Sequence, residues 1–167
     1  MGSVVLRVMV LMAFFALSAC STKFAKYEGP QVTRILVLKE KRRMYLLNGS
    51  DVLKAYDFDL GFAPEGDKKV EGDGRTPEGR YYIDRRNPQS SFYLSLGINY
   101  PNARDRWEAR RLGKSPGGDI FIHGQPNKNP LKARGPDWTA GCIAVTNKEM
   151  REIYAMVQLG TVIDILP

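Results

Sequence analysis

Two stretches, D-I-F-I-H-G at Asp119–Gly124 and D-W-T-A-G-C-I-A-V-T-N at Asp137–Asn147, flank a loop rich in glycine and proline. They contain the only histidine of the chain, His123, and Cys142, the only cysteine besides Cys20. Each of the two residues borders an apolar, β-prone run and has a glycine neighbour, which lets another backbone segment approach closely. We therefore expect two strand ends that bring a thiol and an imidazole together.

Such a pair predicts nucleophilic catalysis. A free thiol has a pKa of about 8.5 and needs a base to become a nucleophile at neutral pH. His123 is the predicted base, which later returns the proton to the leaving group, and Cys142 is the predicted nucleophile. Backbone N–H groups of Ala140 and Gly141 are candidates for binding the oxyanion. In the alternative interpretation, Cys142 is a small buried apolar residue and His123 a hydrogen-bonded core residue.

The residue pattern of these two stretches resembles the motif of the YkuD-type L,D-transpeptidase family. The family pattern is a histidine, a loop of similar length, then Ser/Thr-His-Gly-Cys and an asparagine five residues after the cysteine. The residues that fall on or beside the pattern are His123, Gly124, Thr139, Gly141, Cys142 and Asn147. The resemblance implies a thioester acyl-enzyme with a peptidoglycan stem peptide, transfer to an amine, and no cofactor.

Two positions depart from the pattern. Ala140 stands where the family usually has a second histidine, and Ala144 stands where it usually has an arginine. The YafK-type branch lacks both residues, and resemblance to that branch implies hydrolysis of a peptidoglycan amide, with water as the acceptor. A catalytically inert, peptidoglycan-binding lipoprotein is the third reading that these substitutions leave open.

The N-terminus is typical of an exported lipoprotein. The apolar run Val8–Leu17 is shorter than the roughly 20 residues that a membrane-spanning helix needs, and it suits a signal peptide. L-S-A-C, ending at Cys20, resembles a lipobox, which implies lipid attachment to Cys20 and an outer-membrane location facing the periplasm of a Gram-negative bacterium. An ordinary secretory signal or an uncleaved anchor is the alternative. We divide the chain into a signal peptide (1–19), a lipidated tether (20–31) and a catalytic domain (32–167).

Composition excludes several other classes of function. The formal net charge is +7, but the basic residues are scattered singly or in pairs, and only Lys39–Arg43 and Arg104–Arg111 are denser. This distribution argues against nucleic-acid binding and suits anionic lipid and peptidoglycan carboxylates. One histidine and one available cysteine cannot supply the usual zinc ligands. With Cys20 lipidated, Cys142 has no partner for an intramolecular disulfide. We expect a monomer without metal or cofactor.

The hydrophobic pattern predicts a mainly β (β-rich α+β) fold, and the resemblance implies a YkuD-like β-sandwich or barrel. Asn48-Gly49 is a strong hairpin-turn dipeptide, and Thr76–Gly79 suits a type I turn. Helical composition predicts a helix over Asn102–Leu112, and the resemblance implies that this helix covers the cleft. A capping box of Thr146 and Glu149 begins an amphipathic helix that ends near Gly160. The expected strands are Val32–Lys39, Arg43–Asn48, Val52–Leu60, Arg80–Asp84, Phe92–Leu96, Asp119–Ile122 and Thr161–Leu166.

Overall fold

A computed structural model describes residues 23–129, 133 and 135–167 of the chain. The predicted signal peptide and Cys20 lie outside the described residues. Within those three ranges, no helix combines the length and the apolar character needed to cross a membrane.

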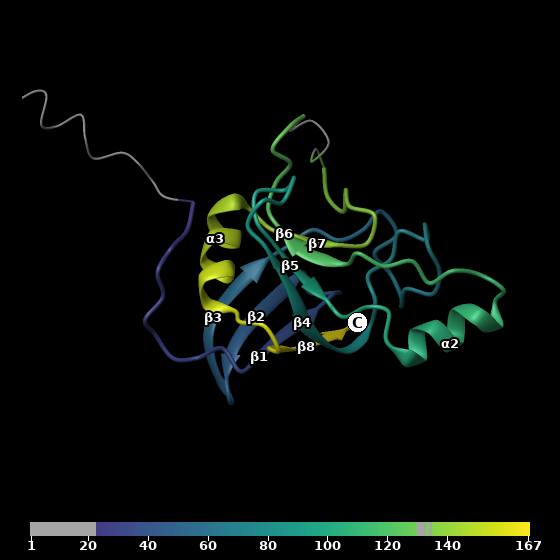
Figure 1. The fold of residues 1–167 in the computed structure, drawn as a ribbon, viewed down its shortest axis with the longest axis horizontal. Helices are drawn as coiled ribbons and strands as arrows, with labels where there is room; N and C mark the ends of the chain where they lie inside the picture. Colours follow the sequence, from purple (N-terminus) through teal and green to yellow (C-terminus); the bar gives the residue numbers. More distant parts are fainter. Residues whose placement is uncertain (1–22, 130–132, 134) are drawn as a thin grey trace, which may run out of the picture.

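The fold is built on one eight-stranded sheet with the strand order β3-β2-β1-β8-β4-β5-β6-β7 (Figure 1). β1 pairs with β8, and β6 with β7, in parallel; the other neighbours are antiparallel. The strands are β1 (Arg34–Leu38), β2 (Arg43–Asn48), β3 (Asp51–Asp57), β4 (Gly79–Asn87), β5 (Ser95–Ile98), β6 (Phe121–His123), β7 (Ile143–Ala144) and β8 (Val162–Leu166).

The two ends of this strand order approach each other. Asp59, just after β3, exchanges two backbone hydrogen bonds of 2.8 and 2.9 Å with Ala144 in β7. The sheet therefore curls into a half-barrel, which confirms the predicted mainly β class with two helices.

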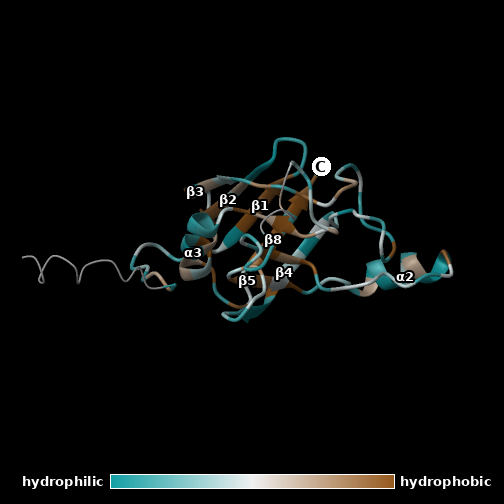
Figure 2. Ribbon diagram, turned by 90° about the horizontal axis from the view of Figure 1, so that it is seen from above, coloured by the Kyte–Doolittle hydropathy of each residue, from teal (hydrophilic) through white to brown (hydrophobic). Residues whose placement is uncertain are grey.

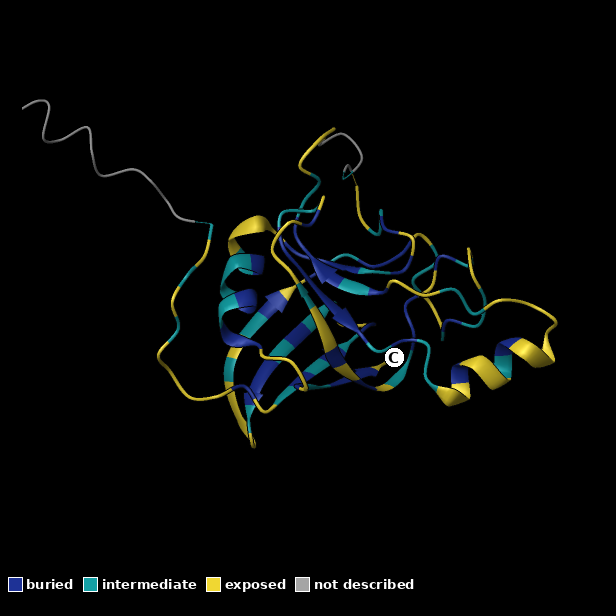
Figure 3. Ribbon diagram, in the orientation of Figure 1, coloured by how far each residue is buried: buried dark blue, intermediate teal, exposed yellow. Residues whose placement is uncertain are grey.

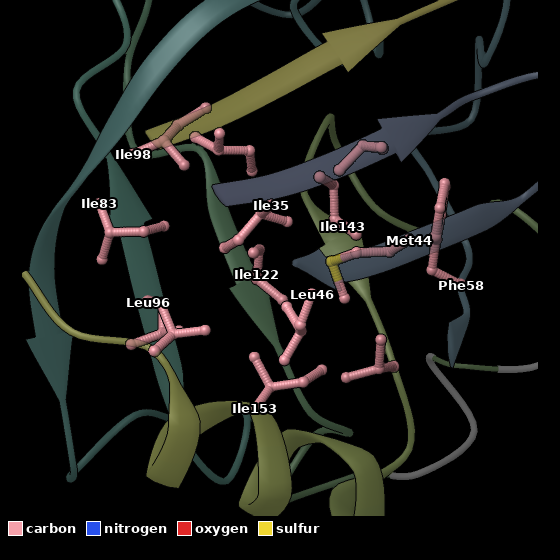
Figure 4. Packing of buried hydrophobic residues seen from close by; sticks show 14 of the residues in the cluster. Ile35, Met44, Leu46, Phe58, Ile83, Leu96, Ile98, Ile122, Ile143 and Ile153 are labelled. Carbon is pink, nitrogen blue, oxygen red and sulfur yellow. The ribbon is translucent and has the colours of Figure 1, made fainter. Parts of the chain in front are cut away.

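The core lies inside this curl. Buried isoleucine, leucine and methionine side chains from both halves of the sheet meet the apolar side of α3 (Asn147–Met156), from which Ile153 points inward (Figure 4). The strand centres are correspondingly the most hydrophobic part of the ribbon (Figure 2). Complete burial of one such side chain contributes about 1.5–3 kcal/mol, so this cluster holds β6, β7 and α3 in a fixed arrangement.

α3 begins as the sequence predicts. The Thr146 hydroxyl accepts the Glu149 N–H, and the Glu149 carboxylate accepts the Thr146 N–H, which completes the capping box. The helix ends at Met156, before the predicted end near Gly160. Val157 is extended and fully buried, so the chain turns into the core there.

Several strand boundaries differ from the predictions, and one predicted turn is missing. β5 begins at Ser95 rather than at Phe92, because Tyr93 adopts a φ of +69° and breaks the extended run. The predicted turn at Thr76–Gly79 is absent from the described structure, and Gly79 instead starts the longer β4. The Thr76 side chain is fully buried and bonds to the distant Gly141 instead of closing a local turn.

The described part of the predicted tether, residues 23–31, lies against the domain beside α3 (Figure 1). Lys23 Nζ donates to the Pro88 carbonyl oxygen at 2.7 Å, and the Phe24 ring lies 6.3 Å from that of Tyr154 in α3. These contacts fix where the segment leaves the domain.

Candidate active site

The parallel pairing of β6 and β7 brings the predicted pair to one cavity. Its register sets Ile122 opposite Ile143, so that Cys142, just before β7, lies level with Phe121. The Phe121 N–H donates to Cys142 Sγ at 3.4 Å. His123 follows two residues later, on the same side of the strand as Phe121. His123 and Cys142 both line a cavity of about 580 Å³.

The His123 ring is held in one orientation. Its Nδ1 lies 2.7 Å from the Gly124 carbonyl oxygen and donates to it, which leaves Nε2 as the acceptor of a neutral imidazole. Only 4% of the residue is exposed. Burial lowers the pKa of His123 below its usual value, so the ring is poised as a neutral base.

Cys142 is a neutral thiol in this arrangement. Sγ lies 3.5 Å from the Asp119 carbonyl oxygen, to which the thiol donates. Burial raises the pKa of Cys142 to about 11, against a smaller lowering by the Phe121 N–H. A preformed thiolate–imidazolium pair is therefore disfavoured, and the proton would move from sulfur to nitrogen only when a substrate carbonyl is attacked.

The turn before Cys142 is tied by Thr139. Its Oγ1 accepts the Gly141 N–H at 3.1 Å and donates to the Cys142 carbonyl oxygen at 2.8 Å. Thr139 therefore shapes this turn. It also uses the Gly141 N–H, which leaves the N–H groups of Ala140 and Cys142 as the better candidates for an oxyanion hole.

Gly141 is required by the space around it. Its φ is +131°, and an added Cβ would lie 2.5 Å from the Arg75 carbonyl oxygen. The Gly141 carbonyl oxygen accepts the buried Thr76 hydroxyl at 2.9 Å. Thr76, which was predicted to lie in an ordinary turn, thus stabilises the turn that precedes Cys142.

Asn147 and Gly124 meet on the other side of the site. Asn147 Oδ1 accepts the Gln125 N–H at 2.7 Å, and an added Cβ on Gly124 would lie 2.5 Å from the same oxygen. The first residue of α3 therefore anchors the chain that leaves His123. This is the close approach that a glycine after the histidine predicts.

Two aromatic residues enclose the imidazole. The Phe92 ring centroid lies 4.5 Å from that of His123, and the Trp138 centroid 5.6 Å from it. Both line the cavity. Trp138 lies four residues before Cys142 in the sequence, so its place at the site follows from its position in the chain. Phe92 could not be identified, since its segment was predicted to be a regular strand.

The first described helix, α2 (Ala103–Arg111), lies away from this cavity. It lies within the predicted segment Asn102–Leu112, and the Asn102 side chain caps its start. None of its residues lines the space around His123 and Cys142. Asp105 is buried and accepts the Tyr81 hydroxyl of β4 at 3.1 Å, which fixes the helix at the side of the sheet instead. α2 therefore does not cover this cleft.

Comparison with known proteins identifies relatives of the whole described domain. Residues 32–165 match the family model of the YkuD L,D-transpeptidase catalytic domain. The chain is 30% identical over 129 residues to "Putative L,D-transpeptidase YafK" of Escherichia coli K12, a match covering 74% of this chain and 46% of that protein.

Solved structures agree with this assignment. The helical cell shape determining protein Pgp2 of Campylobacter jejuni is 29% identical, with a TM-score of 0.61 over 83% of this chain and 49% of Pgp2. Bd1075 of Bdellovibrio bacteriovorus is 28% identical, with a TM-score of 0.56 over 86% of this chain and 50% of Bd1075. The chain matches about half the length of these relatives.

Proposed function

The chain belongs to the YkuD family of L,D-transpeptidase catalytic domains, and on that premise we propose that it is a cysteine acyltransferase acting on peptidoglycan stem peptides. The observation that carries the proposal is that Cys142 and His123 line one cavity, with Nδ1 hydrogen-bonded so that Nε2 is left as a base. No other described feature pairs a nucleophile with a base of matching tautomer.

The proposed acylation transfers one proton through His123 and replaces the C–N bond of the amide by a C–S bond. His123 Nε2 takes the proton of the Cys142 thiol while sulfur attacks the carbonyl carbon of a stem-peptide amide. The N–H groups of Ala140 and Cys142 bind the oxyanion. The tetrahedral intermediate collapses to a thioester, the C–N bond breaks, and the imidazolium returns its proton to the departing amine.

An acceptor amine then completes the transfer. It attacks the thioester, His123 accepts its proton, and the proton returns to sulfur as the C–S bond breaks, so that the enzyme is regenerated. The neutral thiol and imidazole suit this cycle, because neither step requires a thiolate or an imidazolium to be present in the buried cavity before the substrate arrives.

Hydrolysis is the second candidate function. It is favoured by Ala140 and Ala144, which replace the motif histidine and arginine as in the YafK-type branch. Water would take the place of the acceptor amine in the second half of the cycle. The first half, and the roles of Cys142 and His123, would be the same.

Purified muropeptides distinguish these functions. The full chain is incubated with disaccharide peptides, with and without an added amine acceptor, and the products are weighed by mass spectrometry. A cross-linked or exchanged product supports transfer, whereas shortened peptides alone support hydrolysis. Cys142→Ser should lose at least about 10³-fold in rate in either case. Absence of any product, and of a covalent carbapenem adduct on Cys142, would support the inert module.

We also propose that the chain contributes to cell shape, by analogy with Pgp2, a helical cell shape determining protein.

The chain is further proposed to be lipid-anchored through Cys20 on the periplasmic side of the outer membrane. Several acyl chains on one residue would give stable attachment. Labelled palmitate should be incorporated into the wild-type protein and not into Cys20→Ala. Recovery of the wild-type protein in the soluble fraction would contradict this anchoring.

A further inference from the structure

α2 carries an exposed surface that the proposed chemistry does not use. Trp107 is 51% exposed and Leu112 56% exposed. Together with Lys69, Glu108 and Arg111 they line a hollow of about 430 Å³, here called the α2 patch. The helix projects from the end of the molecule and is exposed along most of its length (Figure 3).

The acidic side chains of α2 are turned to internal partners. Asp105 is buried against the Tyr81 hydroxyl. Glu108 forms ion pairs with Lys69 and with Arg104, the latter at 2.8 Å. The helix and its C-terminal turn therefore present mainly basic groups to solvent, among them the exposed Arg106, Arg110, Arg111 and Lys114.

The Trp107 ring is held in place on one side and remains exposed to solvent elsewhere. The Arg111 guanidinium lies 4.7 Å from the centre of the Trp107 ring, an interaction that fixes the ring and places a positive charge beside it. About half of the residue remains open to solvent. An indole surface next to guanidinium and ammonium groups suits a ligand with apolar C–H faces and carboxylates.

We propose that the α2 patch binds a peptidoglycan glycan strand, with a sugar ring stacked on Trp107 and stem-peptide carboxylates paired with Arg111 and neighbouring basic groups. This inference rests on the proposed function and names a second contact for the same polymer. The charge of the patch is complementary to that of a carboxylate-bearing strand.

The position of the patch favours a polymer over a membrane. Membrane-surface helices bury a continuous apolar face, whereas Trp107 and Leu112 are the only exposed large apolar residues described on α2 and its C-cap. The described N-terminal segment, which would lead to the lipid, lies at the opposite end of the molecule from α2 (Figures 1 and 2). The patch thus points away from the membrane that the anchor would enter.

The patch is also within reach of the active site. The segment from Gly113 to Asp119 joins the end of α2 to a residue that lines the cavity. Six peptide units span at most about 22 Å, so Gly113, which follows the patch residue Leu112, lies within that distance of Asp119. A strand held at the patch would therefore keep its peptides near Cys142, which raises their effective concentration.

Binding to sacculi tests the proposal. The full chain, purified in mild detergent and carrying Cys142→Ala to prevent turnover, is sedimented with isolated sacculi. We expect Trp107→Ala and Arg111→Ala each to weaken binding at least fivefold. The matched controls, Leu159→Ala for an exposed apolar residue and Lys41→Ala for an exposed basic residue outside the patch, should bind as the parent does. Circular dichroism would verify that each variant is folded.

Turnover separates this inference from the proposed function. In a chain that keeps the catalytic Cys142, Trp107→Ala should act on soluble muropeptides as the wild type does but lose activity on intact sacculi. Unchanged sacculus binding by Trp107→Ala, an equal loss in Lys41→Ala, or Trp107-dependent binding to phosphatidylglycerol vesicles rather than sacculi would overturn the α2 patch. Lack of turnover on every substrate, with Trp107-dependent binding retained, would overturn the enzyme and leave the patch standing.

Discussion

The backbone N–H of Phe121 donates to the sulfur of Cys142 across 3.4 Å. This contact joins the start of β6 to the residue before β7, and with the Cys142 thiol's bond to the Asp119 carbonyl oxygen it ties the sulfur to the stretch that carries His123. A single N–H offers limited stabilisation of a thiolate. It does not offset burial, which raises the pKa of Cys142 to about 11.

The pH dependence of alkylation follows from this balance. Burial raises the pKa of Cys142 and lowers that of His123, so both favour the neutral pair. At pH 7 the thiolate fraction should be on the order of 10⁻⁴. In a Cys20→Ala chain, the rate of iodoacetamide alkylation should rise about tenfold per pH unit from pH 7 to 10. In urea the profile should instead level off above about pH 8.5–9. A plateau that begins near pH 6 in the folded protein would mean a preformed ion pair.

Trp138→Ala should raise the pKa of His123 toward its ordinary value of about 6.5. The Trp138 ring lies 5.6 Å from the imidazole and helps to exclude water from it, and desolvation is the largest cause of the lowered pKa. Because the chain has one histidine, its titration can be followed by NMR without assignment. Trp107→Ala is the control and should leave the titration unchanged. An unaltered His123 titration in Trp138→Ala would exclude this role for the indole.

Gly141→Ala should destabilise the domain by about 3 kcal/mol or more and abolish activity, because the new Cβ meets the Arg75 carbonyl oxygen in a φ region that is already unfavourable. Gly72→Ala separates the two costs. Gly72 also has a positive φ, but a Cβ added there would have nothing within 4 Å of it, so only the conformational cost of about 1 kcal/mol is expected. Urea unfolding measures both. Equal losses in the two variants would show that close packing at Gly141 is unimportant.

Asn147→Ala should cost about 1–3 kcal/mol, because it removes the acceptor of the Gln125 N–H. Activity should fall as the chain after His123 loosens. Asn147→Asp keeps an acceptor oxygen and adds a negative charge at the start of α3, where the helix dipole favours it; this variant should retain most of the stability and activity. If both variants behave alike, the hydrogen bond does not hold the site.

The features that could be predicted from the sequence are those whose signals lie within a few residues of one another. The capping box of Thr146 and Glu149 and the hairpin turn at Asn48-Gly49 involve residues a few positions apart, and both are present in the structure. By contrast, the sequence contained no sign that Phe92 would leave the extended conformation. Its position beside His123 depends on the positive φ of Tyr93 and on the Gly124 N–H, which donates to the Phe92 carbonyl oxygen at 3.0 Å.

Thr76 illustrates the same limit. A Thr-Pro-Glu-Gly run suits a local turn, but the Thr76 hydroxyl finds its partner 65 residues away, at the Gly141 carbonyl oxygen. α2 is a second example, since a helix over Asn102–Leu112 could be predicted but its place beside β4 depends on the Asp105–Tyr81 contact. Long-range partners of this kind are chosen by packing, which a single stretch of sequence does not encode.

The sequence by itself determined which residues could perform the chemistry, because one histidine and one available cysteine leave a single pairing, and it determined the mainly β class through its alternating apolar pattern. Only the tertiary structure decided that β6 and β7 pair in parallel, that His123 presents Nε2, and that burial shifts the pKa of each group in the direction that favours its uncharged form. The physical reason is that register, tautomer and pKa depend on which atoms surround a residue in space, and those atoms come from distant parts of the chain.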